Sequence, residues 1–125
     1  MENLFIQSDT TTPEIDFKGI SGEFKFTGRS FPENVFDFYN PVLDYINLYA
    51  KQTAPETVVI FNMSYFNTAS YKMIVKILLA FSTIDKNNSP VNIKWCCDVN
   101  DLTIVEKGEE LKEYLKLNLE IVQAV

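Results

Sequence analysis

The sequence predicts an α/β fold with a mixed, mostly parallel β-sheet, an N-terminal β-hairpin and about three helices. Two observations lead to this prediction. Alternating hydrophobic patterns open the chain, and apolar strand-like runs then alternate with helical patterns. Such alternation favours parallel strands joined by helical crossovers, so that helices cover at least one face of the sheet. The 125 residues, 46% hydrophobic and 22% charged, fit a single domain over residues 1–125.

The N-terminal hairpin is predicted from two short period-2 patterns. Ile15 and Phe17 alternate with polar residues, and so do Phe24 and Phe26. Between them lies Gly19-Ile20-Ser21-Gly22, a glycine-bounded segment typical of a short turn. Residues 4–6 are expected to add a further short strand.

The first helix is expected to run from about Glu33 to Ala50. Ser30 is expected to cap it, with Pro32 in its first turn. Pro41 lies inside the helical pattern, so a kink or a break is expected near residues 39–40. The apolar face of this helix is formed by residues at helical spacing, namely Val35, Phe38, Val42, Tyr45, Ile46 and Tyr49.

The rest of the chain alternates between strand and helix patterns. Thr57 to Met63 is a continuous apolar run, which predicts a central strand buried on both faces. The strongest helical pattern runs from Thr68 to about Lys86. Further elements are expected at 91–97 (a strand), from Asp101 to about Lys116 (a helix) and at 119–122 (a strand).

The composition argues against several classes of function. Histidine is absent, which excludes Ser-His-Asp and Cys-His catalysis and histidine metal ligands. The net charge of −6, without a basic cluster, is unfavourable for binding nucleic acid or anionic membranes. No glycine-rich phosphate loop and no calcium-loop spacing occurs, so we expect neither a cofactor nor a metal.

The expected location is the cytoplasm. The first residues lack the pattern of a signal peptide, and the longest purely apolar run, at 77–81, is too short to span a bilayer. Cys96 and Cys97 are adjacent in sequence, which disfavours a disulfide between them. Two free thiols in a reducing compartment are therefore expected.

One segment, Ser64-Tyr65-Phe66-Asn67-Thr68-Ala69-Ser70, carries hydroxyl and amide groups at a strand-to-helix turn. Such turns lie at the edge where parallel sheets bind ligands. In the simplest interpretation Asn67 or Thr68 caps the helix, Ser70 covers another free N–H, and Tyr65 and Phe66 pack beneath the turn. In the functional interpretation a hydroxyl of this turn carries a phosphate, which the helix N-terminus would stabilise and which would spoil an apolar interface.

Four stretches of the sequence resemble the SiaC family of bacterial regulatory phosphoproteins. They occur in family order and span nearly the whole chain. The stretches are Thr12-Pro13-Glu14-Ile15-Asp16-Phe17; Gly28-Arg29-Ser30-Phe31-Pro32-Glu33-Asn34, followed by Phe38-Tyr39 and Pro41; Tyr65-Phe66-Asn67-Thr68-Ala69-Ser70 with Lys72; and Trp95 followed by Glu106-Lys107-Gly108-Glu109-Glu110.

The resemblance implies a non-enzymatic switch protein whose phosphoacceptor is Thr68. A cognate protein kinase would add the phosphate and a PP2C-type phosphatase would remove it. The unphosphorylated form would bind an effector, for which the family suggests a diguanylate cyclase, in cyclic di-GMP and biofilm regulation. This logic is similar to partner switching by anti-sigma-factor antagonists, whose STAS-like fold resembles the one predicted here. Ala69 stands where the family usually has serine, whereas the threonine is present.

We expect the partner-binding surface to surround Thr68. Asn67 is expected to cap the helix or to position the hydroxyl, and Arg29 and Lys72 would pair with the phosphate or with an acidic partner. For Arg29, a plain surface charge is an equal alternative. The other members of the expected surface are Ser64, Tyr65, Phe66 and Ser70.

Three other functions stay open at this point. The domain could bind a small molecule or a nucleotide at the same strand-to-helix edge. An exposed apolar turn would equally serve a homodimer. An enzyme that uses carboxylates alone ranks last, because no nucleophile–base pair is visible.

Overall fold

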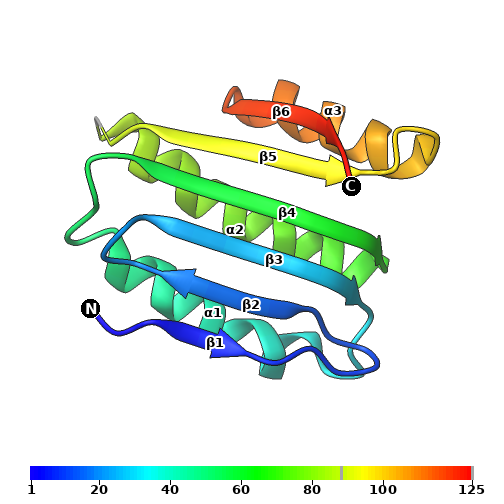
Figure 1. Cartoon of the computed structure of the whole chain (residues 1–125), viewed down its shortest axis with the longest axis horizontal. Helices are drawn as coiled ribbons and strands as arrows, with labels where there is room; N and C mark the ends of the chain where they lie inside the picture. Colours follow the sequence, from blue (N-terminus) through cyan, green and yellow to red (C-terminus); the bar gives the residue numbers. More distant parts are fainter. Residues whose placement is uncertain (88, 125) are drawn as a thin grey trace.

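The computed structural model describes residues 1–87 and 89–124 as a six-stranded sheet with three helices. The first two strand pairs are antiparallel and the following three are parallel, with the strands in sequential order (Figure 1). The predicted mixed, mostly parallel sheet with an N-terminal hairpin is therefore confirmed. The elements are β1 (Leu4–Ile6), β2 (Glu14–Lys18), β3 (Glu23–Ser30), α1 (Val35–Tyr49), β4 (Thr57–Phe66), α2 (Thr68–Lys86), β5 (Val91–Cys97), α3 (Leu102–Leu115) and β6 (Asn118–Gln123).

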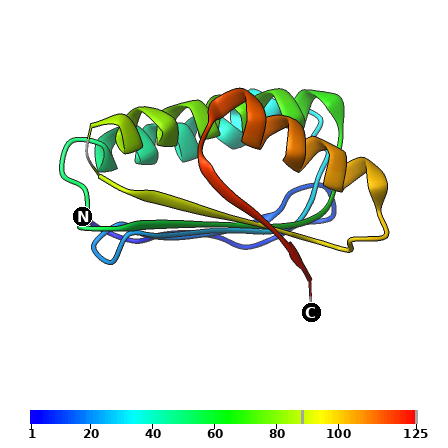
Figure 2. The ribbon, with the colours of Figure 1, turned by 90° about the horizontal axis from the view of Figure 1, so that it is seen from above.

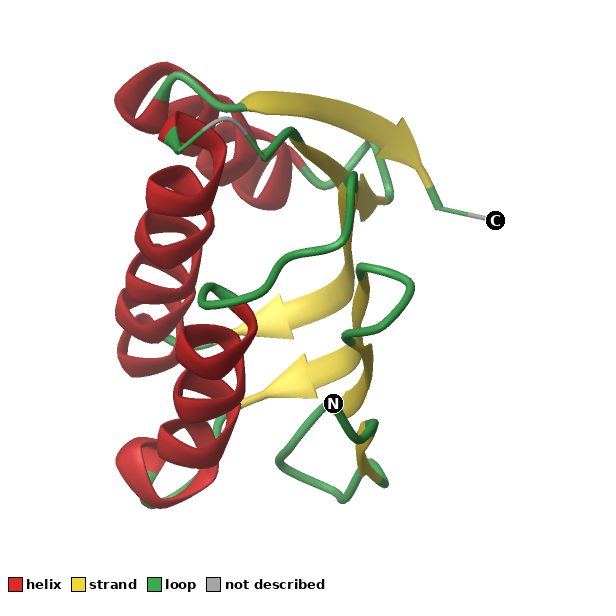
Figure 3. Ribbon diagram, turned by 90° about the vertical axis from the view of Figure 1, so that its left-hand side faces the viewer, coloured by secondary structure: helices red, strands yellow, loops and turns green. Residues whose placement is uncertain are grey.

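All three helices lie on one face of the sheet, and no helix of the described residues, 1–87 and 89–124, covers the other face. Figure 2 shows the helices above the sheet, and Figure 3 shows the same two layers from the side. The prediction that β4 is buried on both faces was therefore wrong. Val59, Phe61 and Met63 are buried toward the helices, whereas Val58 and Ile60 on the open face are only half-buried. A sheet covered on one side needs only every second residue to be apolar.

The hairpin forms as predicted and contributes aromatic side chains to the core. The N–H of Gly22 donates to the carbonyl of Gly19 at 3.2 Å, which closes the turn. Gly22 has φ +75°, a left-handed conformation that favours glycine. Behind the turn, Phe17 packs edge-to-face on Phe24 with ring centroids 4.9 Å apart. Each of these rings is fully buried and contributes about 1.5–3 kcal/mol of hydrophobic stabilisation.

Helix α1 begins later than predicted and is capped by a different residue. Its N-cap is Asn34, whose side chain accepts from the N–H of Asp37 at 3.2 Å. Ser30 does not cap, because it is still paired in β3, and Pro32 lies before the helix. The helix also continues through Pro41 without a break. Proline removes one hydrogen bond there, but buried residues on both sides of it hold the helix to the sheet: Tyr39, Val42, Ile46 and Tyr49.

The later elements agree closely with the predicted bounds. Helix α2 and strand β5 match at both ends, and α3 is flanked by Asp101 as N-cap and Lys116 as C-cap. Strand β4 extends three residues beyond Met63, to Phe66, and β6 exceeds its predicted range by one residue at each end. Cys96 and Cys97 are free thiols, as predicted, and burial raises the pKa of both. None of the helices in the described part of the chain is long and apolar enough to cross a bilayer.

Candidate functional site

The strand before Thr68 contains an irregularity that turns a tyrosine outward. In the β3–β4 pair, Gly28 is opposite Met63 while Arg29 is opposite Tyr65, so Ser64 is an extra residue in β4. On the β3 side of this irregularity, Gly28 has φ +121°, a backbone conformation that favours glycine. As a result both Ser64 and Tyr65 are exposed, although strict alternation would bury Tyr65 beside Met63. The bulge thus presents an aromatic side chain directly before the turn.

Thr68 is exposed and is the first residue of α2. Helix α2 begins at the carboxyl end of β4 (Figure 1). Asn67 precedes it in extended conformation, and its side-chain oxygen accepts from the N–H of Ser70 at 2.8 Å. The predicted capping role of Asn67 is therefore confirmed. Within the described residues, the N–H groups of Thr68 and Ala69 have no hydrogen-bond acceptor. They leave partial positive charge beside the Thr68 hydroxyl.

Ser70 lies beneath this turn and not on its surface. It is fully buried, and its hydroxyl accepts from Ser30 at 2.8 Å; the Ser30 oxygen is in turn 2.6 Å from the Tyr39 hydroxyl. The predicted place of Ser70 in a partner-binding surface is thus wrong, as is a capping role for its hydroxyl. The three hydroxyls join β3, α1 and α2 under the turn. Burial raises the pKa of Tyr39 to about 12, and its hydrogen bond with Ser30 opposes that rise.

An arginine and two aromatic rings form the exposed surface beside the bulge. The Arg29 guanidinium lies 5.0 Å from the ring centroid of Phe31 and 5.8 Å from that of Tyr65. The two rings meet edge-to-face with centroids 5.8 Å apart. Tyr65 therefore does not pack beneath the turn as predicted, and it is 46% exposed. Cation–π contacts of this kind hold an arginine in place without using its hydrogen-bond donors.

Phe66 turns the other way and links the turn to α3. Its ring stacks on Tyr71 with centroids 5.8 Å apart and meets the buried Trp95 edge-to-face at 5.9 Å. Lys107 of α3 lies 4.9 Å from the ring centroid of Tyr71 and forms an ion pair with Glu110 at 3.6 Å. Burial raises the pKa of Tyr71, and the Glu110 carboxylate raises it further. Of the two aromatics predicted to lie beneath the turn, Phe66 alone does so.

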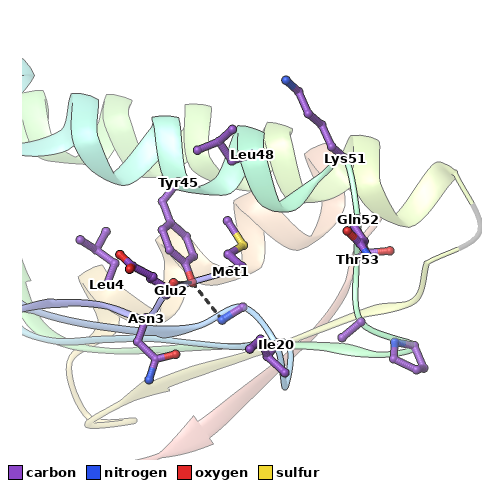
Figure 4. A pocket seen from close by; sticks show the side chains of 13 residues that line it. Met1, Glu2, Asn3, Leu4, Ile20, Tyr45, Leu48, Lys51, Gln52 and Thr53 are labelled. Atoms are coloured by element: carbon purple, nitrogen blue, oxygen red, sulfur yellow. Dashed lines mark hydrogen bonds between the residues drawn. The ribbon is translucent and has the colours of Figure 1, made fainter.

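A cavity of about 840 Å³ lies at the end of the sheet where β3 and β4 begin, far from Thr68 along β4. Figure 4 shows the side chains that line it. The N-terminal segment, the β2–β3 turn, the end of α1 and the loop before β4 line it. Tyr45 is one of its lining residues and joins two of the segments around it. The Tyr45 hydroxyl accepts from the N–H of Gly19 at 3.0 Å and donates to the carbonyl of Glu2 at 2.7 Å. This hollow does not coincide with the strand-to-helix edge, where the alternative function would place a small-molecule site. Within the described residues, no three acidic or cysteine side chains gather as metal ligands.

Comparison with known proteins identifies the class to which this fold and turn belong. The model of the SiaC family regulatory phosphoprotein matches residues 6–124, so the chain belongs to that family. An uncharacterized protein from Pseudomonas aeruginosa strain UCBPP-PA14 is 26% identical over 113 residues, which cover 90% of each chain.

Two solved structures from the same organism share the fold over nearly their full length. Apo-SiaC from P. aeruginosa is 23% identical, with a TM-score of 0.87 and complete coverage of both chains. The chain is also similar, with 25% identity and a TM-score of 0.89, to a chain in the crystal structure of the diguanylate cyclase SiaD in complex with its activator SiaC; 98% of this chain and 99% of that one are covered. The resemblance noted in the sequence is therefore confirmed.

Several contacts around Thr68 were not predicted from the sequence. The Ser30–Tyr39–Ser70 network joins residues up to 40 positions apart, which no local pattern reveals. Its one signal in the sequence is Ser30, which ends an alternating strand pattern at a position that also predicts a helix cap. Lys72 is exposed one helical turn after Thr68, as its predicted role requires.

Proposed function

We propose that this chain is a non-enzymatic, cytoplasmic regulator that binds and activates a diguanylate cyclase, and that phosphorylation of Thr68 prevents this binding. The single observation that supports the switch most strongly is the exposure of Thr68 at the first position of α2. The membership in a family of regulatory phosphoproteins supports the modification, and the solved complex of SiaD with SiaC supports the class of effector.

The chemistry of the switch is reversible phosphoryl transfer by two further enzymes. A cognate kinase transfers the γ-phosphoryl group of ATP to the Oγ of Thr68; the hydroxyl loses its proton and ADP leaves. A PP2C-type phosphatase hydrolyses the ester with water, which restores the hydroxyl and releases inorganic phosphate. Neither step requires a catalytic group from this chain.

The local structure gives the added phosphate both a favourable site and a large effect. The uncommitted N–H groups of Thr68 and Ala69 and the positive end of α2 would stabilise the dianion by about 0.3–1 kcal/mol. The same charge would stand beside the exposed Tyr65 ring, in the surface that a partner must desolvate. A partner with apolar or acidic groups opposite Tyr65 would then lose affinity.

Thr68→Ala and Thr68→Glu test this proposal against a matched control. The control is Thr103→Glu, which changes another exposed threonine in the first turn of a helix, α3. We expect Thr68→Ala to bind a purified diguanylate cyclase of the host and Thr68→Glu to bind at least about tenfold more weakly, which corresponds to 1.4 kcal/mol. Thr103→Glu should bind like the unsubstituted protein.

Binding is measured by isothermal titration and activation by cyclic di-GMP production. Equal affinities for Thr68→Ala and Thr68→Glu would remove Thr68 from the mechanism. Failure of the unsubstituted protein to bind any of the host cyclases would remove the cyclase as effector.

A further inference from the structure

The solvent-facing side of α2 carries a stripe of side chains that begins at Thr68. Residues four, seven, eleven and fifteen positions further on share one face of a helix with the first. In α2 these are Lys72, Val75, Leu79 and Thr83. We call these five residues the α2 stripe. Leu79 is 44% exposed, a large hydrophobic side chain in the middle of a solvated face.

An apolar surface extends from this stripe toward α1. Phe36 of α1 is 55% exposed, and the Lys76 ammonium lies 5.8 Å from its ring centroid. Thr83 donates its hydroxyl to the carbonyl of Leu79 at 3.2 Å, so its polar group is already bonded within the helix. Leucine, phenylalanine and a bonded threonine thus leave few polar groups for water along this surface.

The charged side chains that α2 contributes to this surface are opposite in sign to the net charge of the chain. The chain has a net charge of −6, yet Lys72 and Lys76 stand on this side of α2. The one acidic residue of the helix, Asp85, is engaged elsewhere, because it accepts from the N–H of Val91 at 3.0 Å. Within the described residues neither lysine is in an ion pair; the pair found there joins Lys107 to Glu110.

We propose that the α2 stripe, together with Lys76 and Phe36, is the docking surface for the effector, and that it receives an amphipathic helix with acidic side chains. This rests on the proposed function and names the surface and the chemistry of the partner. The partner helix would lay apolar side chains on Leu79 and Phe36 and place carboxylates near the two lysines. The stripe begins at Thr68, so its phosphate would repel those carboxylates at the end of the same contact.

Two other occupants fit the charges poorly. A second copy of this chain, docked on the same stripe, would bring lysines toward lysines across a symmetric contact. An anionic lipid surface would attract two lysines but repel a chain whose net charge is −6.

Glutamate substitutions with matched controls test the docking surface. Leu79→Glu is compared with Leu48→Glu, which changes an exposed leucine of α1 that lines the cavity at the end of the sheet where β3 and β4 begin. The double variant Lys72→Glu/Lys76→Glu is compared with Lys112→Glu on the exposed side of α3. Circular dichroism and thermal melting establish that each variant is folded before its affinity for the host cyclase is measured.

We expect Leu79→Glu and the double lysine variant each to weaken binding at least tenfold, with both controls unchanged. The affinity of the unsubstituted protein should fall with added salt, and the double lysine variant should show a flatter salt dependence. Stripe variants that bind as tightly as their controls would overturn the inference, even where Thr68→Glu still abolishes binding. If Thr68→Glu binds like Thr68→Ala, the proposed switch fails, whatever the stripe variants do.

Discussion

Gly108 offers the sharpest test of how α3 packs behind the candidate site. It is a buried residue in the middle of α3, where glycine normally costs about 0.5–1 kcal/mol relative to alanine. By propensity alone, Gly108→Ala should therefore stabilise the protein. The structure predicts the opposite, because an added Cβ would lie 2.6 Å from Ile121 Cδ1 and 2.7 Å from Trp95 Cδ1.

The indole of Trp95 cannot yield easily to the added methyl group. It is 2% exposed, its Nε1 donates to the carbonyl of Ile104 at 3.0 Å, and Phe66 packs on its ring. Overpacking of a well-filled core costs about 1–3 kcal/mol, which exceeds the gain in helix propensity. We expect a net loss of about 1 kcal/mol or more in the free energy of unfolding, and a melting temperature lower by about 4 °C.

Urea unfolding measures this loss, and the single tryptophan of the chain reports the site directly by its fluorescence. Glu109→Ala serves as control, since it changes the neighbouring exposed residue of the same helix. A Gly108→Ala protein that is as stable as the unsubstituted one, with unchanged tryptophan emission, would refute the packing argument.

Two further predictions concern Asn67, which caps α2 next to Thr68, and Tyr39, which is buried under the same turn. Asn67→Ala should lower the free energy of unfolding by about 1 kcal/mol, because the N–H of Ser70 loses its acceptor at 2.8 Å. Asn34 accepts its cap hydrogen bond at 3.2 Å, so Asn34→Ala should cost less when measured by the same urea unfolding. The raised pKa of Tyr39 makes stability fall as pH rises from about 10 to about 12, since the unfolded chain releases this proton first. That loss amounts to about 2 kcal/mol at pH 12, and it should be missing in Tyr39→Phe. At neutral pH this substitution leaves Ser30 short of one partner and costs about 1–2 kcal/mol. Equal alkaline unfolding curves for Tyr39→Phe and the unsubstituted protein would contradict the assignment.

The parts of the fold that the sequence predicts well are those with local signals. Helix α2 combines an asparagine cap at Asn67 with a long apolar periodicity, and its bounds were predicted correctly. The hairpin turn was recognised from its two glycines, of which Gly22 takes positive φ. In both cases a few neighbouring residues determine the local conformation.

The parts that were missed depend on pairing between distant segments. Ser30 and Asn34 are both residue types that cap helices. Asn34 is the N-cap of α1, because β3 stays paired with β4 as far as Ser30. The exposure of Tyr65 follows from the extra residue Ser64, whose effect depends on how β4 aligns with β3. A one-residue change of register alters which face a side chain occupies, and a strand's own sequence does not show it.

The central claim, that Thr68 carries a regulatory phosphate, is tested most directly by mass spectrometry of the protein isolated from its native host. The peptide that contains Ser64 to Ser70 is fragmented to locate any phosphate, before and after phosphatase treatment. The account predicts a phosphate on Thr68 that treatment removes, and none on the buried Ser70. A phosphate confined to Ser64 or to another part of the chain, with Thr68 unmodified in all growth conditions, would contradict it.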